Sequence, residues 1–142
     1  LEILIPQEYI TNTSERLRLY NDLDNVETDE ALLTLQNSTK DRFGALPEPV
    51  NELIKSVRLR CLGRDFGLDK IVLKNSAMKL HILEGKKDAY FLSPAFKSLI
   101  QFAQNHPKRC KIKEQNQKLI FSIDHVHSLD DSFPIFASFF RV

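Results

Sequence analysis

The 142-residue sequence contains no tryptophan and only two cysteines. Two cysteines are too few for the disulfide framework of a small secreted domain. We therefore expect Cys61, on an apolar helix face, and Cys110, beside a strand, to be reduced thiols in a cytoplasmic protein. No histidine accompanies either cysteine in a recognisable catalytic pattern, which disfavours a nucleophilic thiol.

Glycine is also scarce, with four in the chain. They form neither GxGxxG nor GxxxxGK[ST], so the sequence offers no phosphate cradle and we predict no cofactor. No apolar run approaches the roughly 20 residues of a membrane span. Residues 1–5 lack the basic flank of a signal peptide, and the chain starts without methionine inside an apolar run. We interpret it as a fragment of a longer protein that has no membrane partner.

Histidine and acidic clusters are sparse as well. His125 and His127 would share one face of a strand, but two ligands do not make a metal site and no Cys or carboxylate pattern completes one. Asp130 and Asp131 suit the positive end of a helix dipole better than a catalytic pair. We predict neither a metal site nor a catalytic residue.

Hydrophobic residues make up 42% and charged residues 27% of the chain, as in ordinary globular domains. The net charge of +1 hides an asymmetry. Residues 1–53 carry 11 acidic and 4 basic side chains, whereas residues 54–142 carry 8 acidic and 16 basic. The two halves therefore create local fields of opposite sign. Most of these charges suit solvated faces, but the acidic half also offers a surface to a basic partner.

Helical periodicity dominates the first half of the chain. A strand is predicted over residues 1–5, followed by helices that begin near Asn12 or Ser14, at Thr28, and at Pro47 or Pro49. Gly44 is expected to end the second helix in the left-handed conformation. The inward-facing residues would be Leu17, Tyr20 and Leu23, then Leu32, Leu35, Thr39 and Phe43, then Val50, Leu53, Ile54, Val57 and Cys61. Opposite them, Glu30, Thr34, Asn37 and Asp41 share one polar face of the second helix.

From Lys70 onward the apolar period becomes two, which indicates strands. Strands are expected at 70–74 and 78–83 around an Asn75-Ser76 turn, and at 110–113 and 118–123 as a hairpin. A further turn is expected at 84–87.

Two more helices complete the prediction. One begins at Ser93 or Pro94 and ends before His106, and the other begins after Ser128 and is limited or delayed by Pro134. The last helix would carry Phe133, Phe136, Phe139 and Phe140. Three N-terminal helices packed with a small, mainly antiparallel sheet, one inserted helix and a C-terminal helix define an α+β fold. We predict a single domain over residues 1–142.

One run of residues carries more specific information. Lys40-Asp41-Arg42-Phe43-Gly44-Ala45-Leu46-Pro47-Glu48-Pro49 joins two predicted helices. With Ile5-Pro6-Gln7-Glu8-Tyr9-Ile10, Arg16, Tyr20 and Gly67-Leu68-Asp69-Lys70-Ile71, it resembles the C-terminal domain of the bacterial transcription-repair coupling factor. The resemblance covers nearly the whole chain and is strongest from Ile5 to Ile71.

The resemblance implies a function without catalysis in this domain. The full-length family member is an ATP-dependent DNA translocase that acts on stalled RNA polymerase and recruits nucleotide-excision repair. Its terminal domain packs on the excinuclease-like N-terminal module of the same polypeptide and masks the surface that binds the excinuclease A protein. The expected partners are thus that module and, for the full-length protein, RNA polymerase, DNA and the excinuclease A protein.

The family contact draws on acidic residues near the end of the second helix, a position that Asp41 matches. Ser38 stands one turn earlier, where the family is often acidic. We therefore expect Asp41, Glu30, Asn37 and Ser38 to bind the partner. The alternative for Asp41 is that it caps the Gly44 corner or pairs with Arg42 or a nearby basic residue. Arg42, Phe43, Gly44 and Pro47 are interpreted as structural.

Two other function classes remain open. The basic half, including Lys108, Arg109, Lys111 and Lys113, suits a nucleic-acid-binding module, although lysines also protect an edge strand from aggregation. A small enzyme would need a polar pocket with convergent titratable groups, which the sequence does not reveal.

Overall fold

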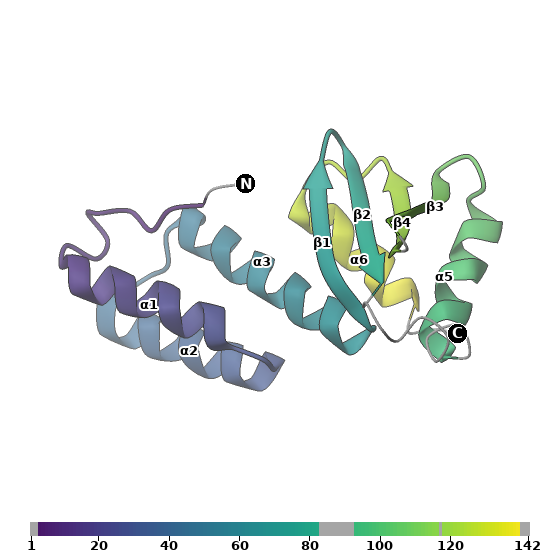
Figure 1. Ribbon diagram of the computed structural model, residues 1–142. Helices are drawn as coiled ribbons and strands as arrows, with labels where there is room; N and C mark the ends of the chain where they lie inside the picture. The colour runs from purple at the N-terminus through teal and green to yellow at the C-terminus, as the bar shows by residue number, and fades with distance from the viewer. Residues whose placement is uncertain (1–2, 83–92, 117, 140–142) are drawn as a thin grey trace. The chain divides into compact units, whose positions relative to one another are not determined.

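The computed structural model describes residues 3–82, 93–116 and 118–139. Over these residues the chain forms five helices and one four-stranded antiparallel sheet (Figure 1). The predicted α+β class is confirmed, with three helices preceding the sheet. Two units can be distinguished within the chain, Leu1–Cys61 and Leu62–Val142, and each is described by itself.

The first unit contains α1 (Thr13–Asn25), α2 (Asp29–Phe43) and most of α3 (Glu48–Asp65). α1 begins where the Asn12 side chain accepts a hydrogen bond from the Glu15 N–H at 3.1 Å. Thr28 caps α2 in the same way through the Ala31 N–H, also at 3.1 Å. These side chains satisfy backbone donors that have no partner inside the helix, so the predicted caps fix where both helices start.

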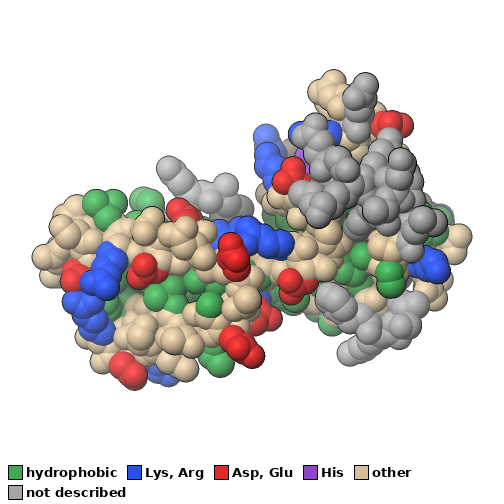
Figure 2. Space-filling model, turned by 60° about the horizontal axis from the view of Figure 1, so that its bottom comes forward, with side chains coloured by type: hydrophobic (Ala, Val, Ile, Leu, Met, Phe, Trp, Pro, Cys, Tyr) green, Lys and Arg blue, Asp and Glu red, His purple; other side chains and the backbone are tan. Residues whose placement is uncertain are grey.

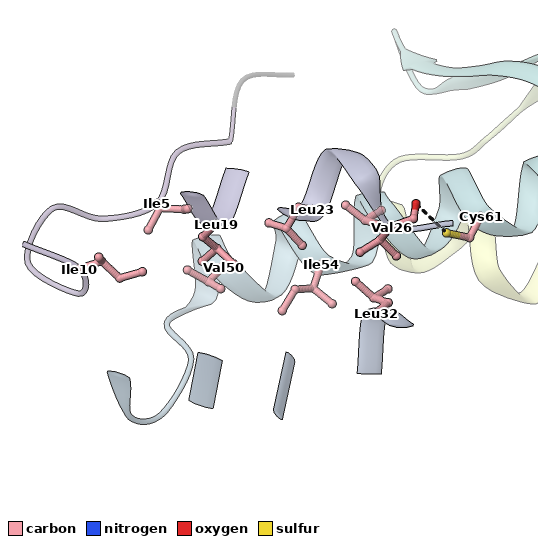
Figure 3. Packing of buried hydrophobic residues seen from close by; sticks show 10 residues of the cluster. Ile5, Ile10, Leu19, Leu23, Val26, Leu32, Val50, Ile54 and Cys61 are labelled. Atoms are coloured by element: carbon pink, nitrogen blue, oxygen red, sulfur yellow. Dashed lines mark hydrogen bonds between the residues drawn. The ribbon is translucent and has the colours of Figure 1, made fainter. Parts of the chain in front are cut away.

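A cluster of buried residues holds the first unit together (Figure 3). α1 supplies Leu19 and Leu23, and α2 supplies Leu32. Val50, Ile54, Val57 and Cys61 recur at helical spacing along α3, as predicted. The Cys61 thiol points to the Val26 carbonyl, with an Sγ–O distance of 4.0 Å (Figure 3).

The prediction of an N-terminal strand is wrong for the described residues, because residues 3–5 adopt no regular structure. Ile5 is nevertheless buried. Its backbone N–H donates to the Tyr20 hydroxyl at 2.6 Å, so a side chain of α1 takes the place of a neighbouring strand. The apolar run seats one side chain in the helical core instead of joining the sheet.

Leu17 also departs from prediction, since 63% of its surface is exposed. The inward stripe of α1 runs through Leu19 and Leu23, spaced four apart, with Tyr20 partly buried beside them. Leu17 lies two residues before Leu19 and so points to a different side of the helix.

The second unit is built on β1 (Leu68–Lys74), β2 (Ala77–Ile82), β3 (Cys110–Gln115) and β4 (Lys118–Asp124). The strand order is β1-β2-β4-β3, so β1 and β3 form the edges. Asn75 and Ser76 have φ values of 54° and 58°, as required by a two-residue hairpin turn, which confirms the predicted turn. The turn predicted at 84–87 lies outside the described residues, as does Phe140.

Alternation along the strands gives the sheet one mostly apolar and one mostly polar face. Met78, Leu80, Phe121 and Ile123 are at most 1% exposed and pair across β2 and β4. α6 (Leu129–Phe139) lies across one face of the sheet (Figure 1), and α5 (Pro94–Asn105) contacts α6. Phe139 of α6 stacks on Phe66 with ring centroids 5.0 Å apart and meets Phe102 of α5 edge to face at 5.5 Å.

Pro134 does not limit α6 as expected but lies inside it. The start of this helix is set instead by reciprocal capping. The Ser128 hydroxyl accepts from the Asp131 N–H, and Asp131 Oδ2 accepts from the His127 N–H. The pair of bonds is a variant of the capping box in which His127, and not the N-cap Ser128, donates to the acidic side chain, and it accounts for Asp131 as a structural residue. Within the described residues, no helix combines the length and the apolar character of a transmembrane segment.

Candidate functional site

The corner after α2 is locked by contacts with two other segments. The Arg42 guanidinium pairs with Glu15 of α1 at 2.7 Å and lies 5.0 Å from the centre of the Phe43 ring. Tyr9 packs edge to face on Phe43, and its hydroxyl donates to the Gly44 carbonyl at 2.8 Å. The predicted structural residues Arg42, Phe43 and Gly44 thus meet at one place.

Gly44 adopts φ +93° and ψ −169°, which is not the left-handed helical conformation that the sequence suggested. This region of φ and ψ is essentially restricted to glycine. Its N–H still donates to the Lys40 carbonyl at 2.9 Å, so Gly44 ends α2 while turning the chain toward Pro47. The Pro47 carbonyl then accepts from the Val50 and Asn51 N–H groups at the start of α3.

The upstream landmark residues also have structural contacts. The Pro6 carbonyl accepts from the N–H groups of Tyr9 and Ile10, which forms a turn. Arg16 donates to the Ile10 carbonyl at 2.7 Å and to the Thr11 carbonyl at 3.2 Å. Together with the Tyr20 bond to Ile5, these contacts fasten the N-terminal segment to α1.

With its inner side fastened, α2 presents Glu30, Thr34, Asn37 and Asp41 on its outer side. Glu30, Asn37 and Asp41 are exposed, as predicted. Leu33 belongs to the same side by helical spacing, and 55% of its surface is exposed. This residue was not predicted from the sequence, although its place three after Glu30 and four before Asn37 could have revealed it. We call Glu30, Leu33, Asn37 and Asp41 the α2 face. Figure 2 shows that both acidic (red) and hydrophobic (green) side chains are exposed on the molecular surface.

Asp41 is the acidic side chain of the α2 face closest to the corner. Arg42, which the alternative interpretation paired with Asp41, is bound to Glu15 instead. The Gly44 corner is closed by Lys40 and Tyr9 rather than by Asp41. Among the described residues no ion pair involves Asp41 or Glu30. The α2 face therefore carries two carboxylates that the described part of the fold does not use.

Ser38 lies apart from the α2 face. It lines a groove of about 170 Å³ between α1 and α2, along with Arg18, Asp22 and the Arg42–Glu15 pair. Its hydroxyl donates to the Leu35 carbonyl at 3.0 Å. The structure thus brings Glu30, Asn37 and Asp41 together and places Ser38 on the adjoining side.

The four basic residues that were considered for nucleic-acid binding have different surroundings in the second unit. Arg109 donates from Nε to the Asp124 carbonyl at 2.8 Å and from a terminal nitrogen to the His125 carbonyl at 3.2 Å, so it ties β3 to the end of β4. Lys108 is exposed in the turn before β3. Lys111 and Lys113 project from β3 on one side of the sheet, where both are exposed.

A hollow of about 270 Å³ lies between α5 and α6. His106 is the one titratable side chain among the described residues that line it, and its ring packs on Phe102 at 4.4 Å. The Ser98 hydroxyl in its wall is bound to the Pro94 and Phe139 carbonyls. The described lining of the hollow therefore lacks the acid–base pair that an enzymatic interpretation would require.

The two histidines after β4 do not share a strand face as predicted, because β4 ends at Asp124 and His125 has a φ of 61°. Their ring centroids are 6.4 Å apart. No group of three potential metal ligands occurs among the residues that the structure describes.

Cys110 is expected to react slowly with iodoacetamide at neutral pH. Burial raises the pKa of its thiol above the ordinary 9.0, and Asp124 raises it further while Arg109 acts in the opposite direction. Because the thiolate is the reactive form, the alkylation rate should still be rising with pH at pH 9 and should level off only above it. A pH–rate profile of alkylation, with the modified cysteine identified by peptide mass mapping, measures this. An apparent pKa for Cys110 below the ordinary value of 9.0 would contradict it.

The same fold occurs in a solved structure titled "Crystal structure of C-terminal domain of transcription-repair coupling factor". The TM-score is 0.74, with 15% identity over 99% of this chain and 88% of that one. The family model of the TRCF domain matches residues 1–91, more than half of the sequence. The chain belongs to the TRCF domain family, as its sequence landmarks indicated.

Curated relatives carry the same family name. The transcription-repair-coupling factor of Borreliella burgdorferi is 25% identical over 117 residues, which are 82% of this chain and 10% of that protein. That of Mycobacterium tuberculosis is 33% identical over 73 residues, or 51% of this chain and 6% of that protein. The chain thus spans about a tenth or less of the length of these relatives.

Proposed function

We propose that this chain is a noncatalytic regulatory domain of a larger cytoplasmic protein that couples transcription to DNA repair. The α2 face docks on the excinuclease-like N-terminal module of the same polypeptide and masks the surface to which the excinuclease A protein binds. Membership of the TRCF domain family supports a role in transcription-coupled DNA repair. The chain matches only 10% of the length of its Borreliella burgdorferi relative, which supports its assignment as one domain of a longer protein.

The observation that carries the proposal is the state of Asp41. Glu15 binds Arg42 and Tyr9 binds Gly44, so two of the intramolecular alternatives for Asp41 are taken by other residues. The third, an ion pair with a nearby basic residue, does not occur among the described residues. An exposed carboxylate that the described fold does not use is available to a basic side chain of a partner. Leu33 adds an apolar contact in the middle of the face, as the cores of protein interfaces usually contain.

The strength of such a contact suits an inhibitory clamp. An exposed ion pair contributes about 0–1 kcal/mol. A few such pairs around one apolar side chain hold a domain that is already tethered, because the tether supplies a high effective concentration. The same contact opens when another partner competes for either surface.

Asp41→Arg in the full-length protein is expected to raise the affinity for the excinuclease A protein roughly threefold to tenfold. The substitution removes one ion pair and adds a like-charge contact, each worth up to about 1 kcal/mol. The affinity is measured by titrating labelled full-length protein with the excinuclease A protein.

Asp24→Arg is the matched control, because Asp24 is an exposed aspartate of α1 outside the α2 face. It should leave the affinity unchanged. A second measurement titrates the isolated N-terminal module with the 142-residue chain, and Asp41→Arg should weaken this binding. Equal affinities for Asp41→Arg, Asp24→Arg and the unaltered protein in both titrations would refute the docking role of the α2 face.

A further inference from the structure

The polar face of the sheet carries a concentration of lysines that the docking proposal does not use. The pairing places Val72, Lys79, Ser122 and Lys111 in one cross-strand row. The next row contains Lys70, His81, Ile120 and Lys113. By the same alternation Lys74 and Lys118 belong to this face, which therefore gathers six lysines from all four strands. We call it the lysine face.

The lysine face is accessible over the described residues. Lys70, Lys74, Lys79, Lys111 and Lys113 are exposed, and Lys118 is half-buried. The opposite face holds the buried Met78, Leu80, Phe121 and Ile123. The one acidic residue in register on the described lysine face is Asp124, paired with Ala77 at the end of β2.

The pKa of His81 responds to the charges on the lysine face. Burial lowers its pKa from the ordinary 6.5, and the charges of Lys70, Lys118 and Lys79 lower it further against the opposing effect of Asp69. Lysines on three different strands thus act on one imidazole in the middle of the face. The positive potential is a property of the folded sheet and not of a local run in the sequence.

Protection of an edge strand accounts for only part of this pattern. Lys111 and Lys113 lie on β3, an edge of the sheet, where lysines discourage pairing with another chain. Lys79 and Lys118 lie on β2 and β4, which have neighbours on both sides. Their positive charges have no role in shielding an edge.

We propose that the lysine face binds the phosphate backbone of a nucleic acid without sequence preference. The six lysines are distributed over four strands, and neighbouring strands lie about 5 Å apart. Such an array of positive charges matches a polyanion with regularly repeated charges. The strand residues of this face include no Phe or Tyr on which bases could stack. The contacts are therefore to phosphates, which position a nucleic acid but do not read its bases.

An acidic protein fits this surface less well. Protein interfaces are depleted in lysine and rely on buried Trp, Tyr or Arg anchors. The described lysine face has no such residue at its centre, where Ile120, Ser122 and His81 lie between the lysines. The lysine face can therefore recognise a ligand only through charge. This favours a nucleic acid, which carries one negative charge on every nucleotide.

Titration of the 142-residue chain with a labelled mixed-sequence single strand, and separately with the matching duplex, tests the proposal. The salt concentration is varied from about 50 to about 200 mM, and six phosphate contacts to a single strand should give a slope of log affinity against log salt near −4. Lys79→Gln/Lys111→Gln should make the slope less negative by about 1.4 and lower the affinity roughly tenfold at the lowest salt. For the duplex, six contacts should give a slope of about −5.4, and the double variant should make it less negative by about 1.8. Either DNA form that meets its own expectation supports the proposal.

Lys40→Gln/Lys97→Gln is the matched control, since it removes the same charge from α2 and α5, which contribute no residue to the lysine face. It should leave the slope and affinity close to those of the unaltered chain. Equal losses in the two double variants would show nonspecific attraction by net charge and overturn the proposal. Absence of binding to both DNA forms at about 50 mM salt, or tighter binding of poly-glutamate of equal charge, would also overturn it.

A measurement on the unaltered chain avoids any effect of substitution on folding. The pKa of His81, followed by the NMR shifts of its ring protons, should lie below 6.5 in the free chain and rise when DNA is bound, because phosphates offset the field of Lys70, Lys79 and Lys118. Asp69 acts on His81 in both states. An unchanged pKa of His81 at saturating DNA would place the DNA elsewhere and overturn the proposal.

Discussion

Phe136→Ala is expected to lower the free energy of unfolding of the second unit by about 3–5 kcal/mol. Phe136 of α6 is 1% exposed, and its ring meets Phe66 at 6.1 Å and Phe139 at 5.4 Å, both edge to face. The substitution leaves a cavity among aromatic rings and removes two favourable ring contacts. Because native domains are stable by only about 5–15 kcal/mol, this loss is large enough to unfold the unit under mild denaturation.

Hydrogen exchange followed by mass spectrometry measures this effect for each unit of the chain. Amides of β2 and β4 should lose protection in Phe136→Ala. Ala137→Ser, at the exposed neighbouring position of α6, should change the stability by no more than about 0.5 kcal/mol. Full protection of β2 and β4 in Phe136→Ala would show that these rings do not hold the unit together.

Arg60→Ala should destabilise the first unit by about 2–4 kcal/mol. The guanidinium of Arg60, on α3, donates to the Leu23 carbonyl at 2.8 Å and to the Val26 carbonyl at 2.9 Å, so it caps the C-terminal end of α1. Hydrogen bonds from charged groups contribute about 1.5–3 kcal/mol, and a cation at this end of a helix also interacts favourably with the helix dipole. The alanine variant removes both of these bonds at the place where α1 meets the core.

Arg60→Lys separates the charge from the geometry. Arg60 Nε is buried and has no acceptor among the described residues, so a lysine removes this unsatisfied donor but retains the positive charge. Its loss of stability should be smaller than that of Arg60→Ala. Arg18→Ala, at an exposed position of α1, serves as the control and should be nearly neutral. Exchange protection of α1 amides reports all three variants, and an Arg60→Ala variant that is as stable as Arg18→Ala would contradict the capping role.

Phe136→Ala and Arg60→Ala are expected to change the stability of the two units at residues that are not part of the proposed binding surfaces. Arg60 holds the end of α1, and the neighbouring α2 carries the α2 face. Phe136 of α6 is buried against the rings of Phe66 and Phe139 and is not part of the lysine face. Charge changes at Asp41 or Lys79 should leave stability almost unaltered, because both side chains are exposed. Binding and stability can therefore be changed independently in this chain.

Local signals in the sequence were sufficient for most of the elements. Caps such as Asn12, Thr28 and Ser93 join a side chain to the backbone N–H three residues later, so they can be recognised along the chain. The turn at Asn75-Ser76 and the alternation of β2 and β4 are equally local. The prediction of an N-terminal strand failed because a distant residue decides there: Tyr20 takes the N–H of Ile5, and residues 3–5 have no strand partner.

The amino-acid sequence by itself determined the α+β class, the family landmarks and the polar side of α2, because these follow from the spacing of residues within one element. Tertiary structure alone decided which charges remain available. It paired Arg42 with Glu15, 27 positions away, and so left Asp41 without an ion pair among the described residues. It also set lysines from four strands in neighbouring rows, since strand order and register, which no single segment encodes, determine which side chains become neighbours.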